Sequence, residues 1–498
     1  MRAWLGWLTK QNKTVYNLAT HVLKISWYGC TETMTLASLP VRYENHLAIG
    51  HPDRRRVLVL PDANGWRLPA FVEAEGHFWQ EIGHINHWMA EHLGIAATTL
   101  RCLAINYTPD DEVLSKVYAA VLEERVPMLP HAASWVSAEE VLTLPLAVEE
   151  HRTALVDWFA WYSASATPAP ALRTPWYMPG WYEAAVAWAN HTLHTHQMRL
   201  TGQPIQLRSW QRSAIVRLPT NQGAAYLKVV PPVAHYEPAL TTVLASLMPR
   251  RVAQPIALDQ QHGRLLMHEV EGISLMRYRD DDDLALWQQA LAEFASLQIA
   301  TTSHLGELRA TGLPTRSLAE LEHHVLALLH DLPATLPNRP AGLSRHERER
   351  LRRLAGQLSR RWEALQSDGI PLALEHGDFW AGQVLINQDA FVFLDWADSS
   401  LSHPFFSLLL FLVESEDFLP HIPNVRERLR DAYLEPWSSV VPGVNLVRAF
   451  EQTQLLAALQ QAVYYHTVVL PSLEVKWELE LMPPFYLKMA LRLSENEG

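Results

Sequence analysis

The sequence predicts an α+β protein with more than one domain. At 498 residues the chain is too long for one ordinary hydrophobic core. Residues 164–175 are rich in Ser, Ala, Thr and Pro, which is the composition of a linker. Before this segment, strand patterns surround one long helix pattern. After it, three strand patterns give way to a series of long helix patterns.

The composition is that of a globular protein. Hydrophobic residues make up 48% of the chain, and the net charge is −12. This charge argues against a nucleic-acid partner and is compatible with a cationic small substrate, although solubility explains it equally well. Cys30 and Cys102 form neither a metal motif nor a disulfide framework, so a cytoplasmic location is expected. Since no apolar run reaches the roughly 18 residues of a membrane span, no membrane partner is expected.

The first 33 residues differ from the rest in composition. Three of the seven lysines fall within the first 24 residues, whereas Arg carries most of the positive charge elsewhere. The segment lacks the apolar core and cleavage site of a signal peptide. A basic extension and an upstream start that is not the natural one both fit this pattern. We favour the second, with Met34 as the first residue, and treat residues 1–33 as a doubtful extension.

Residues 34–163 are expected to form the first folded unit. Apolar residues recur every three or four positions in its longest helix pattern, which stops at Gly94. The expected strands and helices are 56–60, 67–72, 78–93, 100–107, 113–122, 137–141 and 151–162. This order of elements, with a helix that ends in Leu-Gly-Ile, resembles the Nudix fold.

The resemblance to Nudix proteins does not extend to their catalytic acids. Nudix hydrolysis needs acidic helix residues that hold magnesium on a pyrophosphate. Aligned on Gly94, Glu91 matches one acid of the family's pair, but His92 replaces the other. Trp79 and Trp88 replace earlier acids of the motif. The resemblance therefore implies a Nudix-like module whose helix lacks the catalytic acids, so that no hydrolase activity is expected.

Several histidines on and before the same helix raise the alternative of a metal site. They do not all share a helical face, and neither Cys nor Asp joins them, so we expect solvated or core-edge side chains. The histidines concerned are His77, His84, His87 and His92.

Residues 375–404 carry the strongest chemical signal. Asp378 follows His-Gly, Gln383 lies five residues later, and an apolar strand delivers Asp395. In a phosphoryl-transfer centre, one carboxylate orients the attacking hydroxyl, while an amide and a second carboxylate hold magnesium. A surface loop before a buried strand is the alternative, but the coincidence of so many spacings disfavours it. The pattern therefore predicts a phosphotransfer site.

Apolar residues 384–386 and 391–394 flank a polar turn, which predicts a β-hairpin within this site. The whole run resembles the aminoglycoside phosphotransferase family, whose members share a protein-kinase-like fold. Gln383 stands where that family usually has Asn, and Ser402-His-Pro stands in place of its Asp-Pro segment. The resemblance covers roughly residues 176–498. It implies that Asp378 is catalytic, that Gln383 and Asp395 bind Mg²⁺, and that ATP or another nucleoside triphosphate is the donor.

The same resemblance assigns nucleotide contacts. Lys228 lies alone in an apolar strand pattern, which is costly unless an anion accompanies its ammonium group. In the resembled fold the anions are nucleotide phosphates and a helix carboxylate, for which Glu237 is the best candidate. A lysine at a strand edge is the alternative. In a loop without glycine, Arg212 or Ser213 is a candidate phosphate contact. Backbone groups of His268 to Val270 are expected to read the adenine edge.

Residues 273–498 are expected to form a mostly helical lobe, following an N-terminal lobe at 176–272. Capping boxes at Ser317–Glu320 and Ser344–Glu347 open two of its helices. Further helices are expected at 284–301, 405–416, 424–435, 446–468 and 473–493. An acidic group could form a wall for a cationic acceptor, but solvated helix faces are the favoured explanation. Its members are Glu414, Glu416, Asp417 and Glu478.

Together these patterns predict a Nudix-like α/β module followed by a two-lobed, protein-kinase-like phosphotransferase domain. The expected function is an ATP-dependent small-molecule kinase that phosphorylates a hydroxyl of a small acceptor, and the acidic net charge is compatible with a cationic one. A regulatory or nucleotide-binding pseudokinase is the alternative, favoured by Gln383 and by the missing glycine loop. A nucleotide-pyrophosphate hydrolase is disfavoured by the missing acids. The patterns leave the acceptor and the oligomeric state open.

Overall fold

The structure is a computed structural model of the chain. It describes residues 42–74, 76–108, 112–122, 132–162, 170–337, 339, 341–388 and 390–495, without the side chains of Asp281 and Glu478. The expected extension at 1–33, the expected start at Met34 and residues 164–169 of the expected linker lie outside this part. No helix within it is long and apolar enough to cross a membrane.

The chain divides into two compact units. One ends at Pro231 and the other runs from Pro232 to Gly498. This division differs from the domain boundaries expected around residues 164–175 and 272, which remain predictions.

A seven-stranded sheet dominates the first unit. Its strands follow the order β3-β2-β1-β6-β5, with β4 paired to β1 and β7 paired to β2. The β1–β6 pair is parallel, and β5 runs antiparallel to β6. The strands are β1 (Arg42–Gly50), β2 (Arg56–Asp62), β3 (Gly65–Arg67), β4 (Ala70–Glu73), β5 (Ala97–Thr108), β6 (Val113–Leu122) and β7 (Ser134–Ser137). The strand expected at 67–72 is interrupted at Pro69, which has no amide hydrogen to donate to a ladder.

Helix α3 (Gly83–Leu93) begins five residues later than the helix expected from residue 78. Residues before it form a turn, in which the amide of Glu81 donates to the carbonyl of Phe78 at 2.9 Å. The amide of Ile82 then donates to the carbonyl of Leu207 at 3.0 Å. This pairing with a distant strand replaces the first helical turn. The helix ends at Gly94, in the left-handed conformation, as expected.

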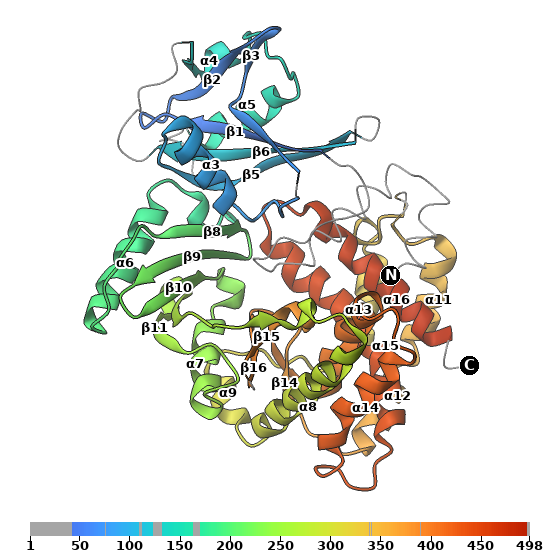
Figure 1. The fold of residues 1–498 in the computed structure, drawn as a ribbon. Helices are drawn as coiled ribbons and strands as arrows, with labels where there is room; N and C mark the ends of the chain where they lie inside the picture. Colours follow the sequence, from blue (N-terminus) through green and yellow to red (C-terminus); the bar gives the residue numbers. More distant parts are fainter. Residues whose placement is uncertain are drawn as a thin grey trace. The chain divides into compact units, whose positions relative to one another are not determined.

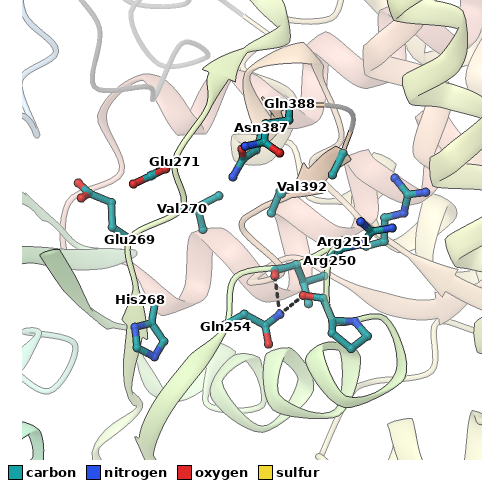
Figure 2. Close-up of a pocket in the computed structure, with 13 residues that line it drawn as sticks. Arg250, Arg251, Gln254, His268, Glu269, Val270, Glu271, Asn387, Gln388 and Val392 are labelled. Carbon is teal, nitrogen blue, oxygen red and sulfur yellow. Dashed lines mark hydrogen bonds between the residues drawn. The ribbon is translucent and has the colours of Figure 1, made fainter. Parts of the chain in front are cut away.

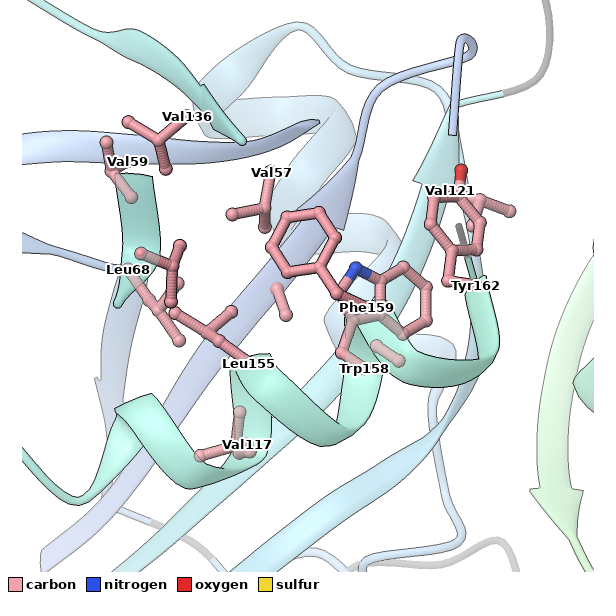
Figure 3. Packing of buried hydrophobic residues seen from close by; sticks show 14 of the residues in the cluster. Val57, Val59, Leu68, Val117, Val121, Val136, Leu155, Trp158, Phe159 and Tyr162 are labelled. Carbon is pink, nitrogen blue, oxygen red and sulfur yellow. The ribbon is translucent and has the colours of Figure 1, made fainter. Parts of the chain in front are cut away.

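Helix α5 (His151–Tyr162), which matches the expected range, covers one face of this sheet. Figure 3 shows its side chains Leu155 and Phe159 on the side of the sheet residues Val57, Val59 and Leu68, and Trp158 and Val117 belong to the same buried cluster. Helix α4 (Ala138–Val141) precedes it. There the Ser137 hydroxyl accepts from the amide of Glu140 at 3.2 Å, which completes a capping box.

The rest of this unit is helix α6 (Trp181–Thr195) and three antiparallel strands (Figure 1). The strands are β8 (Ile205–Trp210), β9 (Ser213–Thr220) and β10 (Gly223–Val229). The apolar patterns of the sequence predict these elements at 181–195, 205–210, 213–219 and 224–230, and each observed end lies within one residue of the predicted one. Ser213 begins β9 and the buried Lys228 lies near the end of β10.

The second unit is mostly helical, as expected. Its helices are α7 (Glu237–Leu247), α8 (Leu284–Thr301), α9 (Leu305–Ala310), α10 (Leu321–His330), α11 (Arg345–Ala355), α12 (Leu358–Ser367), α13 (Leu408–Phe418), α14 (Val425–Trp437), α15 (Leu446–Tyr464) and α16 (Met482–Glu495). Its strands are β11 (Pro255–Asp259), β12 (Arg264–His268), β13 (Ile273–Ser274), β14 (Ala373–Glu375), β15 (Val384–Asn387), β16 (Ala390–Phe393) and β17 (Ser400–Ser402). They form the β11–β12 hairpin, the β13-β15-β16 sheet and the β14–β17 pair.

Two helix starts differ from expectation. The box expected at Ser317–Glu320 does not form, because the Ser317 hydroxyl accepts from the nearer amide of Ala319 at 3.2 Å. Helix α10 begins after Glu320 without a side-chain cap. The last helix begins at Met482 rather than near 473. The box expected at Ser344–Glu347 is confirmed at the start of α11.

The core of this unit lies directly beneath the predicted catalytic segment. Helix α8 buries Trp287, Leu291 and Phe294. The ring of Phe294 stacks on Phe379 with centroids 3.8 Å apart, and Phe379 stacks in turn on Phe411 at 5.0 Å. A residue adjacent to Asp378 is therefore anchored in the core.

Candidate active site

The predicted hairpin forms and brings two predicted metal ligands to one place. Strands β15 and β16 are antiparallel, with Val384 opposite Phe393. Beyond this pair, the carbonyl of Gln383 accepts from the amide of Leu394 at 2.9 Å. Gln383 and Asp395 therefore stand at the same end of the hairpin.

His376 ties the loop of Asp378 to that end. Its buried ring lies with Nε2 2.9 Å from the carbonyl of Leu394. A carbonyl only accepts, so Nε2 carries the hydrogen of this bond. The amide of His376 donates to the hydroxyl of Ser407 at 3.0 Å. The His376 side chain thus holds the loop that carries Asp378 at the end of the hairpin where Gln383 and Asp395 lie.

Gly377 allows two loops to approach closely. Its φ is +81°, and a Cβ on it would lie 2.1 Å from the carbonyl oxygen of Asp398. Its amide donates to Glu375 Oε1 at 2.7 Å, while the Ser400 hydroxyl donates to Glu375 Oε2 at 2.9 Å. Burial raises the pKa of Glu375, and the charge of Arg316 opposes that rise.

Asp395 occupies the left-handed region, with φ +62°, which is uncommon for a residue other than glycine. Helix α7 holds the chain that follows. Oε1 of the buried Glu237 accepts from the amide of Trp396 at 3.0 Å. The Tyr236 hydroxyl lies 2.6 Å from the carbonyl of Ala397. These contacts were not predicted, because they join positions about 160 residues apart.

Glu237 was predicted as the partner of Lys228. The two residues belong to different compact units, so their pairing remains a prediction. The hydrogen bond from the amide of Trp396 places Glu237 beside Asp395, apart from any pairing with Lys228.

The side chains of Gln383 and Asp395 suit a hard cation. Both residues are half-buried, and carboxylate and carboxamide oxygens are the donors that Mg²⁺ accepts alongside water and phosphate. The described residues contain no group of three or more His, Cys, Asp and Glu that could hold a metal alone. A two-ligand site completed by phosphate and water is consistent with this. Gly382 is required here by packing, since a Cβ on it would lie 2.1 Å from the Trp380 ring.

A buried acid lies near Asp378. Glu414, on α13, is 3% exposed, and its Oε2 has no hydrogen-bond partner among the described residues. Burial raises the pKa of Glu414 well above its usual range, and the charges of Asp378 and Asp417 raise it further. The expectation that Glu414 lies on a solvated helix face is therefore wrong. Glu416 is exposed, as that expectation requires, and the side chain of Glu478 lies outside the described residues.

Aromatic residues share this neighbourhood. Burial raises the pKa of Tyr486 on α16, and Tyr465, Asp378 and Glu414 add to the rise. The rings of Tyr465 and Tyr486 lie 5.8 Å apart. Tyr465 opens a π-helical turn, Tyr465–Val469, at the end of α15. Such turns are frequent at functional sites.

The segment expected to read adenine lines a cavity of about 530 Å³ (Figure 2). Val270 and Val392 border it, together with Asn387 and Gln388 at the tip of the β15–β16 hairpin. The amide of His268 already donates to the carbonyl of Gln254 at 3.0 Å. The amide of His268 is therefore already paired within the protein, and the predicted role of His268 and Val270 remains a prediction.

The predicted site residues lie in a segment that is similar to a known family. Residues 205–442 match the phosphotransferase enzyme family. The matched range contains every predicted site residue, from Ser213 and Lys228 to Asp395. A search of curated proteins found no significant match to the chain.

Solved structures similar to the chain include three phosphotransferases. A macrolide 2'-phosphotransferase from Brachybacterium faecium is 16% identical, with a TM-score of 0.39 over 61% of this chain and 96% of that one. A choline/ethanolamine kinase family protein from Mesorhizobium loti is 15% identical, with a TM-score of 0.41 over 59% and 89%. A Plasmodium vivax ethanolamine kinase is 9% identical, with a TM-score of 0.45 over 69% and 94%.

Proposed function

We propose that the protein is a small-molecule kinase that transfers the γ-phosphate of ATP, or of another nucleoside triphosphate, to a hydroxyl group. The observation that carries this proposal is the convergence of Asp378, Gln383 and Asp395 at one end of the hairpin within the phosphotransferase domain. The products are a phosphate ester and the nucleoside diphosphate.

Each residue has a distinct role in this reaction. Asp378 orients the acceptor hydroxyl and accepts its proton, and Gln383 and Asp395 hold Mg²⁺. When bound, Mg²⁺ and the nucleotide supply charge neutralisation and the phosphoryl group. Glu237 keeps Asp395 in place through the amide of Trp396. Lys228, with Glu237 and Ser213, steadies the phosphates, while the segment from His268 to Val270 contacts the adenine edge.

The acceptor is a hydroxyl compound that carries a cationic group. Glu414 is a buried carboxyl without a donor on Oε2, and it lies within electrostatic range of Asp378 and Asp417. The raised pKa keeps this carboxyl protonated in the free protein, and a cation that binds beside it favours the ionised form. Tyr465 and Tyr486 add aromatic rings to the same neighbourhood, and aromatic faces attract cations.

The test combines binding with transfer. Amino alcohols, aminoglycosides, macrolides and uncharged sugars would be tested as acceptors, with ATP or GTP and Mg²⁺ as the donor. The readout is the release of nucleoside diphosphate. We expect turnover with a cationic alcohol, and its loss in Asp378→Asn with nucleotide binding retained. Nucleotide at 100 times its dissociation constant should stabilise both proteins by about 2.7 kcal/mol.

A regulatory pseudokinase is the second candidate, favoured by Gln383 in place of the Asn of the resembled family. Gln has a stem one methylene longer, whereas Mg²⁺ demands near-ideal octahedral geometry. Nucleotide binding without turnover on any acceptor would favour this candidate. No nucleotide binding would exclude both.

We also infer that residues 34–163 form a Nudix-like module without hydrolase activity. The mixed sheet with a parallel β1–β6 pair and the α3 helix ending at Gly94 support the likeness. The absence of activity is supported by Glu91, which is exposed and pairs with His87 at 3.3 Å. His77 and His84 stack at 4.0 Å with planes 16° apart, so their ring planes cannot both contain one metal ion.

A further inference from the structure

Arg316 joins the candidate site from a distant part of the sequence. It lies between α9 and α10, in a segment that runs beside β17. The amide of Arg316 donates to the carbonyl of Leu401 at 3.1 Å, and the amide of Leu401 donates to the carbonyl of Pro314 at 2.8 Å. Thr315 and Leu401 form a parallel bridge. The backbone around Arg316 is therefore fixed against the segment that follows Asp395.

The side chain of Arg316 contacts both loops of the site. Its side chain is 13% exposed, and Nη2 donates to the carbonyl of Asp398 at 2.9 Å. Nη1 lies 3.6 Å from Oε2 of Glu375, the buried residue three positions before Asp378. One cation thus links the loop that carries Asp378 to the segment after Asp395.

Tyr464 completes this network from α15. The guanidinium of Arg316 lies over its ring, 3.7 Å from the centroid, and the Tyr464 hydroxyl donates to Oδ1 of Asp398. Gln461, one turn earlier, donates through Nε2 to the carbonyl of Gly377 at 2.7 Å. A planar guanidinium can stack, donate to a carbonyl and pair with a carboxylate at once, whereas an ammonium cannot.

We propose that Arg316 is a positioning residue for phosphoryl transfer, which sets the place of Asp378 relative to Asp395 by fastening their two loops together. This inference rests on the proposed function. Arg316 acts through Glu375 and Asp398 and not on the substrate. The two loops are in close contact at Gly377, where no Cβ fits beside the carbonyl of Asp398. Arg316 donates to this same carbonyl, so its loss is expected to change the spacing between the loops.

The experiment compares Arg316→Lys and Arg316→Ala with wild type and with Arg345→Ala. Arg345 is an exposed arginine of the same unit that pairs with Glu349 at 3.0 Å, so its variant controls for the loss of an ion pair. The readouts are hydrogen exchange of residues 375–378 and 396–400, the KM for ATP, and kcat per nucleotide-binding molecule with the acceptor found in the screen. Arg316→Lys keeps the charge and is the variant that should fold.

We expect faster exchange in both segments of Arg316→Lys, with KM for ATP within about threefold of wild type. Its kcat should fall by about 10- to 100-fold, because misplacing a reacting group by about 1 Å costs on the order of 100-fold. Arg345→Ala should match wild type. In Arg316→Ala combined with Glu375→Gln, removal of both charges should recover stability but not kcat.

Unchanged exchange and kcat in Arg316→Lys would overturn the proposal. A lower melting temperature with an unchanged kcat per nucleotide-binding molecule would also overturn it, since Arg316 would then only stabilise the fold. If the wild type transfers phosphate to no acceptor, the proposed function fails separately. In that case the exchange measurement still decides whether Arg316 fastens the two loops.

Discussion

At the scale of single residues, the proposed chemistry depends on side chains in unusual environments. Asp395 has a left-handed backbone, and Glu414 is a buried carboxyl whose Oε2 lacks a donor among the described residues. Both features cost free energy, and such costs concentrate at functional sites. Gln383 adds a third departure, because it offers the expected carboxamide on a longer stem.

The metal ligands are tested by nucleotide binding titrated with magnesium. Asp395→Asn should abolish magnesium-dependent binding, because it removes a negatively charged ligand. Gln383→Ala should weaken it, and Gln383→Asn should preserve or improve it, since the shorter stem matches the resembled family. Nucleotide binding that is independent of magnesium in all these proteins would contradict the assignment of both residues.

Glu414 predicts a dependence of stability on pH. Burial raises the pKa of Glu414 above that of the unfolded chain, so the folded state retains a proton that the unfolded state releases. Stability from this group is therefore present below about pH 4.5, the usual Glu value, and declines as the pH rises through the folded pKa. Thermal unfolding of Glu414→Gln should show a gain over wild type that grows between pH 5 and pH 8.

Glu416→Gln is the matched control for Glu414→Gln, because Glu416 is exposed on the same helix. Its melting temperature should follow that of wild type across the pH range. The acceptor screen adds a second comparison: Glu414→Gln should raise the KM of a cationic acceptor more than that of ATP. Equal pH profiles for Glu414→Gln and Glu416→Gln would contradict the role of burial.

At the scale of elements, the β15–β16 hairpin and the loop before it do most of the positioning. The hairpin brings Gln383 beside Asp395, and His376 ties the Asp378 loop to the same end. The loops approach each other at Gly377. Such an approach requires a residue without Cβ and with a positive φ.

Gly377→Ala should destabilise the protein and remove transfer activity. The left-handed conformation alone costs about 1–2 kcal/mol for a residue with Cβ, and the clash 2.1 Å from the Asp398 carbonyl adds to it. Gly443→Ala separates these effects, because Gly443 has φ +84° and nothing within 4 Å of its Cβ position. Denaturant unfolding should show a larger loss for Gly377→Ala. Equal losses would mean that the close approach is unimportant.

At the scale of the whole molecule, the chain divides into two compact units. The second contains Asp378 and Asp395, and the first contains the seven-stranded sheet and α3, for which we propose a Nudix-like fold. The net charge of −12 fits a cationic small acceptor but does not identify one.

The full-length protein should release no nucleoside monophosphate from ADP-ribose or other nucleoside diphosphate derivatives with Mg²⁺ or Mn²⁺. The helix α3 lacks the acids that would hold these ions, and its Glu91 is exposed and paired with His87. Phosphate-release and chromatographic assays would check this. Turnover that disappears in Glu91→Gln would contradict the prediction.

The sequence by itself determined the features that depend on nearby residues. The hairpin, the α5 and α8 ranges, the Ser344 capping box and the stop at Gly94 follow from local periodicity and capping. The segment that we propose to be catalytic is predicted in the same way, because its spacing is short and its residue types are specific. Short-range patterns survive folding when no distant contact competes with them.

Only the tertiary structure decided the features that depend on distant partners. The link from Glu237 to Trp396, the bridge from Arg316 to Asp398 and the burial of Glu414 join residues or helices that no local pattern connects. The later start of α3 has the same origin, since its first residues bond to β8 instead of forming a helical turn. A local pattern states what a segment prefers, but burial and long-range hydrogen bonds determine which preference is met.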